Sequence, residues 1–76
     1  MDKWTPEQVA RAIQDDIDAY EKLKALLVSA SGDEVRRIDL QKFDKLTQIR
    51  ELKKELIEKG RADLWEQFKD WEKSIS

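Results

Sequence analysis

The chain has 76 residues, a length typical of one small domain. It contains neither cysteine nor histidine, which excludes disulfides, thiolate zinc sites and the commonest general base and metal ligand. Fifteen Lys and Arg nearly balance seventeen Asp and Glu, and the longest uninterrupted apolar run, residues 25–28, is far too short to span a membrane.

The first predicted element is a helix over about residues 6–29. Thr5 suits the N-cap, Pro6 the first helical position, and Gln8 completes a capping box with Thr5. Trp4 and Val9 have the spacing of a hydrophobic staple. One apolar stripe then follows the helix at intervals of three and four residues: Val9, Ile13, Ile17, Tyr20, Leu23 and Leu27.

Two interpretations of residues 28–38 remain open at this stage. In the first, Gly32 ends the first helix and Asp33 caps a second one. In the second, Gly32 and Asp33 form a two-residue turn between short strands, and the second helix starts at Asp39. We favour the helical interpretation, because such a short pair of strands is marginally stable.

The clearest helix in the sequence is the second, predicted over about residues 34–59. Gly60 is a natural stop, since glycine adopts the left-handed conformation that closes a helix. Five apolar residues at helical spacing share one face: Leu46, Ile49, Leu52, Leu56 and Ile57. Phe43 and Val35 widen this face, and such a broad face packs against more than one neighbour.

A third, shorter helix is predicted over about residues 62–74. Leu64, Phe68, Trp71 and Ile75 form its apolar stripe, with Trp65 on the flank. The fold class expected for residues 1–76 is therefore all-α, an antiparallel helical hairpin with a shorter third helix. The alternative is an α+β fold with a small β-hairpin at 28–38.

The third helix is too short to reach the turn at Gly32 if it starts beside Gly60 and lies along the hairpin. Apolar residues near that turn should therefore stay uncovered, and such patches usually mark contact surfaces. Tryptophan is enriched at interface hot spots, so Trp65 and Trp71 join the candidates. The predicted partner-binding residues are Val35, Ile38, Phe43, Leu26, Val28, Trp65 and Trp71.

Charge is distributed unevenly along the chain. Residues 1–34 carry four basic and eight acidic side chains, whereas residues 36–61 carry nine basic and five acidic ones. We expect two helices of opposite charge side by side, with Asp16 at the edge of the buried face or paired with a lysine of the second helix. The alternative is a nucleic-acid face formed by Arg36, Arg37, Lys42, Lys45, Lys53 and Lys54.

One family resemblance covers about half the chain. A helix, a small-residue turn, V-R-R-I-D-L and then I-R-E-L-K-K-E-L resembles the small phage head–tail joining proteins of the lambda W type, which have a helix, a β-hairpin and a second helix opened by an Asp-Leu pair. The resemblance implies a structural assembly protein without chemistry of its own. The matching positions are Gly32, Arg37, Asp39, Leu40, Ile49 and Leu52.

These observations favour a protein–protein interaction module over an enzyme. No catalytic, cofactor-binding or metal-ligating residues are predicted, since serine lacks a histidine base and the two glycines lie far apart. The expected setting is a phage or bacterial accessory protein, either a structural connector or a small inhibitor or adaptor of a larger protein. We expect a cytoplasmic or virion-associated location, no membrane partner, and a protein partner, most simply a second copy.

Overall fold

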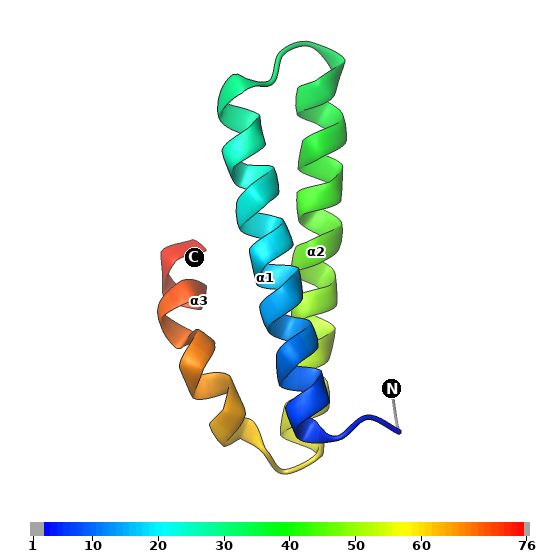
Figure 1. Ribbon diagram of the computed structural model, residues 1–76, viewed down its shortest axis with the longest axis vertical. Coiled ribbons are helices and arrows are strands. Elements are labelled where there is room, and N and C mark those ends of the chain that lie inside the picture. Colours follow the sequence, from blue (N-terminus) through cyan, green and yellow to red (C-terminus); the bar gives the residue numbers. More distant parts are fainter. Residues whose placement is uncertain (1–2, 76) are drawn as a thin grey trace.

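A computed structural model describes residues 3–75, so Met1, Asp2 and Ser76 of the predicted domain lie outside the described residues. Two long antiparallel helices, α1 (Pro6–Ser29) and α2 (Asp33–Glu58), form a hairpin. A 3₁₀ helix, η1 (Ala62–Phe68), and a short helix, α3 (Lys69–Ile75), fold back along it (Figure 1). The predicted all-α hairpin with a shorter third helical segment is confirmed.

The N-terminus of α1 has the predicted capping box. The Thr5 hydroxyl accepts a hydrogen bond from the Gln8 backbone N–H at 3.2 Å, and the Gln8 side chain accepts one from the Thr5 N–H at 2.9 Å. Pro6 occupies the first helical position, where its missing N–H leaves no bond unmade. These residues fix where α1 begins without any help from the rest of the fold.

The turn between α1 and α2 contains no strand, and there is none elsewhere in residues 3–75. The β-hairpin alternative for residues 28–38 is therefore wrong, and the hairpin that the family resemblance implied is absent. Gly32 is the N-cap of α2, with φ 64° and ψ −133°, a conformation that only glycine adopts without strain. α1 already ends at Ser29, so Gly32 caps α2 and does not end α1, and Asp33 is the first residue of α2 and not its cap.

Gly60 ends α2 in the predicted way. Its φ is 74°, and its N–H donates to the Ile57 carbonyl at 3.0 Å. The N–H of Arg61 donates to the Leu56 carbonyl, also at 3.0 Å. This pair of bonds is a Schellman motif, which satisfies the last carbonyls of a helix and reverses the chain.

The third segment differs from the single α-helix predicted over 62–74, because its first half is the 3₁₀ helix η1. A 3₁₀ helix has three residues per turn, so Trp65 and Phe68 lie directly above one another. Both are buried, at 4% and 3% exposure, and their rings pack 5.4 Å apart. Leu64, predicted for the buried stripe, is only partly buried and packs at the edge of the core.

The hydrophobic core occupies the half of the hairpin remote from the Gly32 turn. The side chains of α1, α2 and η1 meet there, because the third segment stops near the middle of the hairpin (Figure 1). None of the helices in residues 3–75 is both long and apolar enough to cross a membrane. The buried cluster consists of Val9, Ala10, Ile13, Ile17, Ile49, Leu52, Leu56, Trp65 and Phe68.

Candidate protein-contact surface

The turn-proximal half of the hairpin keeps most of its large apolar side chains in contact with water. Val28 is 89% exposed, Phe43 62% and Leu26 50%, while Val35 and Ile38 are partly buried. Leu40, which sequence reasoning did not include among the contact residues, is also 62% exposed. Its position three residues before Phe43 places both on one helical face, a signal that was present in the sequence.

The predicted patch is divided between two faces of the hairpin. Leu26 and Ile38 together line a hollow between α1 and α2. Val28 lies two residues beyond Leu26, about 200° around α1, and Phe43 lies five residues beyond Ile38, about 140° around α2. Exposed apolar residues therefore occur on both sides of the turn-proximal half rather than in one continuous patch.

The outward side of α2 carries two large exposed apolar side chains, Leu40 and Phe43. We call Leu40 and Phe43, together with Val35 and Leu46 on the adjoining side of the same helix, the turn-proximal face. Phe43 and Leu46 differ by three residues, so they are neighbours on the helix surface. Val35 precedes Leu46 by eleven residues, close to three full turns, so it lies on the same side of α2 but nearer the Gly32 turn. The third segment stops near the middle of the hairpin (Figure 1), and it reaches this face only at Leu46, which lines a crevice together with Ile75 of α3.

The tryptophans take three different positions. Trp65, one of the predicted partner contacts, is 4% exposed and lies in the core, so its ring presents little surface to a partner. Trp71 packs against the core and stands edge-on to the Tyr20 ring, with centroids 5.6 Å apart. Trp4 is 41% exposed and lies beside Ala12 at the surface between α1 and α2.

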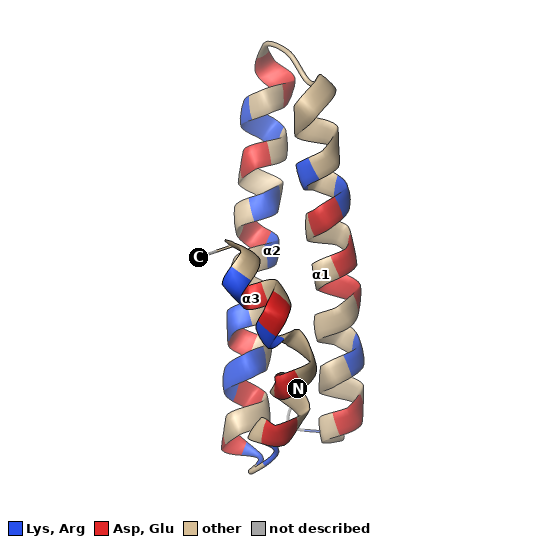
Figure 2. Cartoon of the chain, turned by 90° about the vertical axis from the view of Figure 1, so that its left-hand side faces the viewer, with Lys and Arg blue, Asp and Glu red and all other residues tan. Residues whose placement is uncertain are grey.

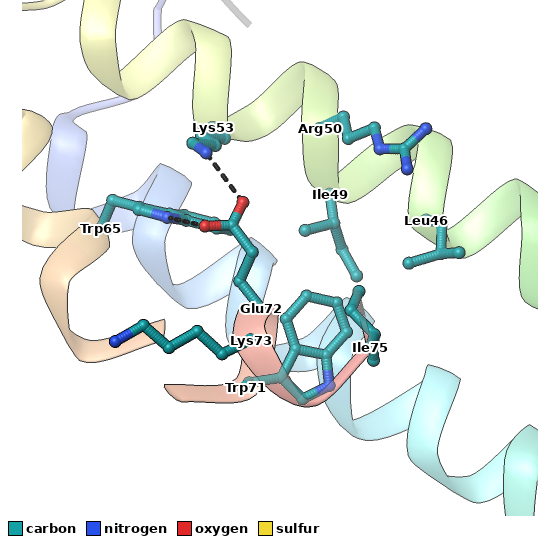
Figure 3. Close-up of a pocket in the computed structure, with 9 residues that line it drawn as sticks. All are labelled: Leu46, Ile49, Arg50, Lys53, Trp65, Trp71, Glu72, Lys73 and Ile75. Carbon is teal, nitrogen blue, oxygen red and sulfur yellow. Dashed lines mark hydrogen bonds and ion pairs between the residues drawn. The ribbon is translucent and has the colours of Figure 1, made fainter. Parts of the chain in front are cut away.

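A polar clamp fixes the third segment on α2 (Figure 3). The Glu72 carboxylate accepts a hydrogen bond from Lys53 Nζ at 2.8 Å and one from Trp65 Nε1 at 3.3 Å. The Lys53 ammonium also lies 4.8 Å from the Trp65 ring centroid. The hydrogen bond from Lys53 is the main reason why the pKa of Glu72 falls below its ordinary value.

The clamp borders a crevice of about 330 Å³ between α2 and α3 (Figure 3). Its apolar walls come from Leu46, Ile49, Trp71 and Ile75, and its rim carries Arg50, among other charged groups. The Trp71 indole N–H is covered and has no hydrogen-bond partner among residues 3–75. Since Leu46 also belongs to the turn-proximal face, the crevice and that face form one surface.

The predicted basic strip is largely engaged within the fold. Lys53 pairs with Glu72, Lys42 lies 4.0 Å from Asp39, and Lys45 lies 3.7 Å from Asp16. Blue and red segments alternate along α2 in Figure 2. No ion pair joins the remaining candidates Arg36, Arg37 and Lys54 to another residue within 3–75, and these three do not gather into a groove.

Asp16 pairs across the hairpin with a lysine of α2, one of the two roles considered for it. Burial raises the pKa of its carboxyl above the ordinary value, because desolvation disfavours the charged form, and the nearby Lys45 ammonium counteracts this effect. This pair matches the acidic α1 to the basic α2 near the middle of the molecule. No group of three or more Asp and Glu residues within 3–75 is placed to hold a metal ion.

No protein-family model, curated protein or solved structure matches the sequence. The likeness to phage head–tail joining proteins therefore stays a prediction. The surfaces and their chemistry carry the functional argument.

Proposed function

We propose that this protein is a non-enzymatic protein–protein interaction module that binds its partner through the turn-proximal face. The observation that carries the proposal is the uneven distribution of burial. Leu40 and Phe43 are each 62% exposed while the core fills only the other half of the hairpin. Each Å² of apolar surface that leaves water contributes ~25 cal/mol, so a partner covering these side chains gains binding energy.

The setting that fits this proposal is a phage or bacterial accessory protein, either a connector in an assembly or a small inhibitor or adaptor of a larger protein. Its place of action would be the cytoplasm, or the virion if the phage resemblance holds. The rigid hairpin supports such a role, since a contact surface on packed helices needs little ordering on binding.

Nucleic-acid binding through α2 has weaker support. Lys42, Lys45 and Lys53 each have a carboxylate close by, so phosphate would have to compete with neighbours that are already in place. Measuring affinity for a DNA or RNA duplex against salt concentration separates the two functions, because phosphate contacts weaken steeply as salt rises.

A matched pair of variants tests the proposal. Phe43→Glu and Ile57→Glu both place a carboxylate at an exposed apolar position of α2, since Ile57 is 51% exposed, but only Phe43 belongs to the turn-proximal face. We expect Phe43→Glu to abolish capture of partner protein from the native host, and Ile57→Glu to leave it intact, with unchanged circular dichroism for both.

Equal capture by both variants would contradict the proposed face. Unfolding by Phe43→Glu would instead show that Phe43 belongs to the core, and that the chain itself covers this end.

A further inference from the structure

A groove between α1 and α2 follows the hairpin on the face that η1 and α3 do not cover. It is a row of hollows in which neighbouring hollows share residues. The shared residues are Trp4 and Ala12 at the open end of the hairpin, which lies opposite the Gly32 turn, Gln48 in the middle, and Leu26 and Gln41 towards the turn. No residue of η1 or α3 lines these hollows. We call this feature the interhelical groove.

The α1 side of the groove faces away from the third segment. Ala12 and Ala19 each lie two residues, or about 200°, from Ala10 and Ile17. Ala10 and Ile17 are buried in the core cluster with Trp65 and Phe68, whereas Ala12 is only partly buried and packs at the edge of that cluster. The groove therefore runs along the edge of the core, where the buried Leu52 also lines it.

We propose that a second copy of the chain packs along the interhelical groove, antiparallel to the first, about a two-fold axis at Ala19. This inference rests on the proposed function, that the protein acts by binding protein, and it assigns the second copy to a face that does not include Phe43. Residues along the groove match a second copy in side-chain size and in charge.

Side-chain size is complementary about Ala19. Ala12 and Leu26 lie seven residues on either side of it, almost two helical turns, so all three are on one side of α1. An antiparallel two-fold therefore sets Leu26 of each copy against Ala12 of the other, a large side chain against a small one. Trp4 borders Ala12, so the contact covers both exposed apolar groups of this face, Leu26 at 50% and Trp4 at 41%.

Charge is complementary in the same arrangement. The open-end half of the groove is lined by more acids than bases. In the turn half, Lys45 already pairs with Asp16 of the same chain and the other charges balance, so the contact that favours an antiparallel copy is the one between Asp15 and Lys22 near the axis. The open-end charges are Asp15, Asp16, Glu51 and Arg11; those of the turn half are Lys22, Lys45, Arg37, Glu34 and Asp44.

The same surface provides both partners of each match, which is what a two-fold interface requires. Asp15 lies four residues before Ala19 and Lys22 three residues after it. Asp15 of one copy consequently meets Lys22 of the other, and the symmetry makes this contact twice. Both side chains lie at the surface of the single chain, so exchanging their charges leaves the fold of each copy intact.

Sedimentation equilibrium at low salt tests the inference with Asp15→Lys and Lys22→Glu, each alone and mixed in equal amounts. Each single variant sets like charges against one another at both contacts, which should raise the dimer dissociation constant by ~10-fold or more. In the mixed pair, the lysine introduced into one chain meets the glutamate introduced into the other, and the unchanged Asp15 meets the unchanged Lys22. We expect the mixture to dimerise as well as the wild type.

A wild type that stays monomeric at high concentration overturns the inference, as does a mixture that associates no better than either variant alone. Phe43→Glu makes the two proposals distinguishable. If it dissociates the dimer while the groove variants do not, the second copy binds the turn-proximal face, so the proposed function stands and the groove assignment fails. If it abolishes partner capture but leaves the dimer intact, both stand.

Discussion

Glu72 shows how one side chain holds the third segment in place. Its carboxylate accepts hydrogen bonds from Lys53 of α2 and from the Trp65 indole in the core. The Glu72 side chain is 42% exposed, so water screens the ion pair. A contribution of ~0.2–1 kcal/mol to the free energy of unfolding is appropriate for such a pair.

We predict that Glu72→Gln lowers the free energy of unfolding by this modest amount at neutral pH, measured by urea denaturation. The pKa of Glu72 is lowered in the folded state, so the unfolded chain binds more protons as the solution is acidified. The stabilising contribution is therefore present above the ordinary pKa of 4.5 and is lost as the pH falls through the lowered folded value.

The stability difference between wild type and Glu72→Gln should accordingly shrink on acidification. Glu66→Gln is a suitable control, because the ion pair between Glu66 and Lys69, at 2.9 Å, lies within the third segment and does not join it to α2. A constant difference between wild type and Glu72→Gln from pH 7 to pH 3 would show that the ion pair does not stabilise the fold.

Trp4 and Trp65 make a second comparison at the residue scale. Trp65 is 4% exposed and Trp4 41%, so truncating Trp65 leaves a large cavity in the core. We predict that Trp65→Ala costs ~3–5 kcal/mol of stability and that Trp4→Ala costs much less, both from chemical denaturation. Comparable losses for the two variants would mean that Trp4 is as deeply packed as Trp65.

The sequence did not distinguish these tryptophans. Each lies near an apolar stripe, and the spacing of apolar residues along a helix does not show how deeply a ring is buried in the core. In the structure Trp65 and Phe68 belong to the core and Trp71 packs against it, whereas Trp4 is 41% exposed.

At the scale of the elements, the two glycines at the ends of α2 differ in conformation. Gly60 has φ 74° at the position where a Schellman motif uses the left-handed helical region. Gly32 has φ 64° but ψ −133°, which lies outside that region. An added Cβ would meet no atom within 4 Å at either glycine, so the cost of substitution is conformational.

We therefore predict that Gly60→Ala destabilises the protein by ~1–2 kcal/mol and that Gly60→Asn costs less, since asparagine tolerates the left-handed region. At Gly32, alanine should cost ~1–3 kcal/mol and asparagine should give no such relief. Thermal melts of the four variants check this, and an equal benefit from asparagine at both sites would contradict the assigned turn.

Much of the hairpin was predictable from local signals. The capping box at Thr5 and the glycine stop at Gly60 act through hydrogen bonds within a few residues, so the sequence alone locates them. The 3₁₀ helix η1 was not predictable, because over seven residues a period of 3.0 cannot be told from 3.6. Tertiary packing of Trp65 and Phe68 decides between the two.

At the scale of the whole molecule, the third segment divides the hairpin into a packed half, which it covers, and the turn-proximal half, which it leaves uncovered. This division follows from segment length and was expected from the sequence. The sequence did not show that the exposed residues of the turn-proximal half lie on two faces, because that depends on the rotation of each helix about its own axis. As a result, Leu26 lies beside Ile38 in the groove, and Leu40 and Phe43 form the outward face.

Photo-cross-linking in the native host tests the central claim most directly. A photoreactive phenylalanine analogue replaces Phe43 in one protein and Ile57 in another, so both probes are exposed on α2 and differ in the half they occupy. Binding through the turn-proximal face predicts a discrete cross-linked protein from position 43 and none from position 57. No product from position 43, or the same products from both positions, would contradict it.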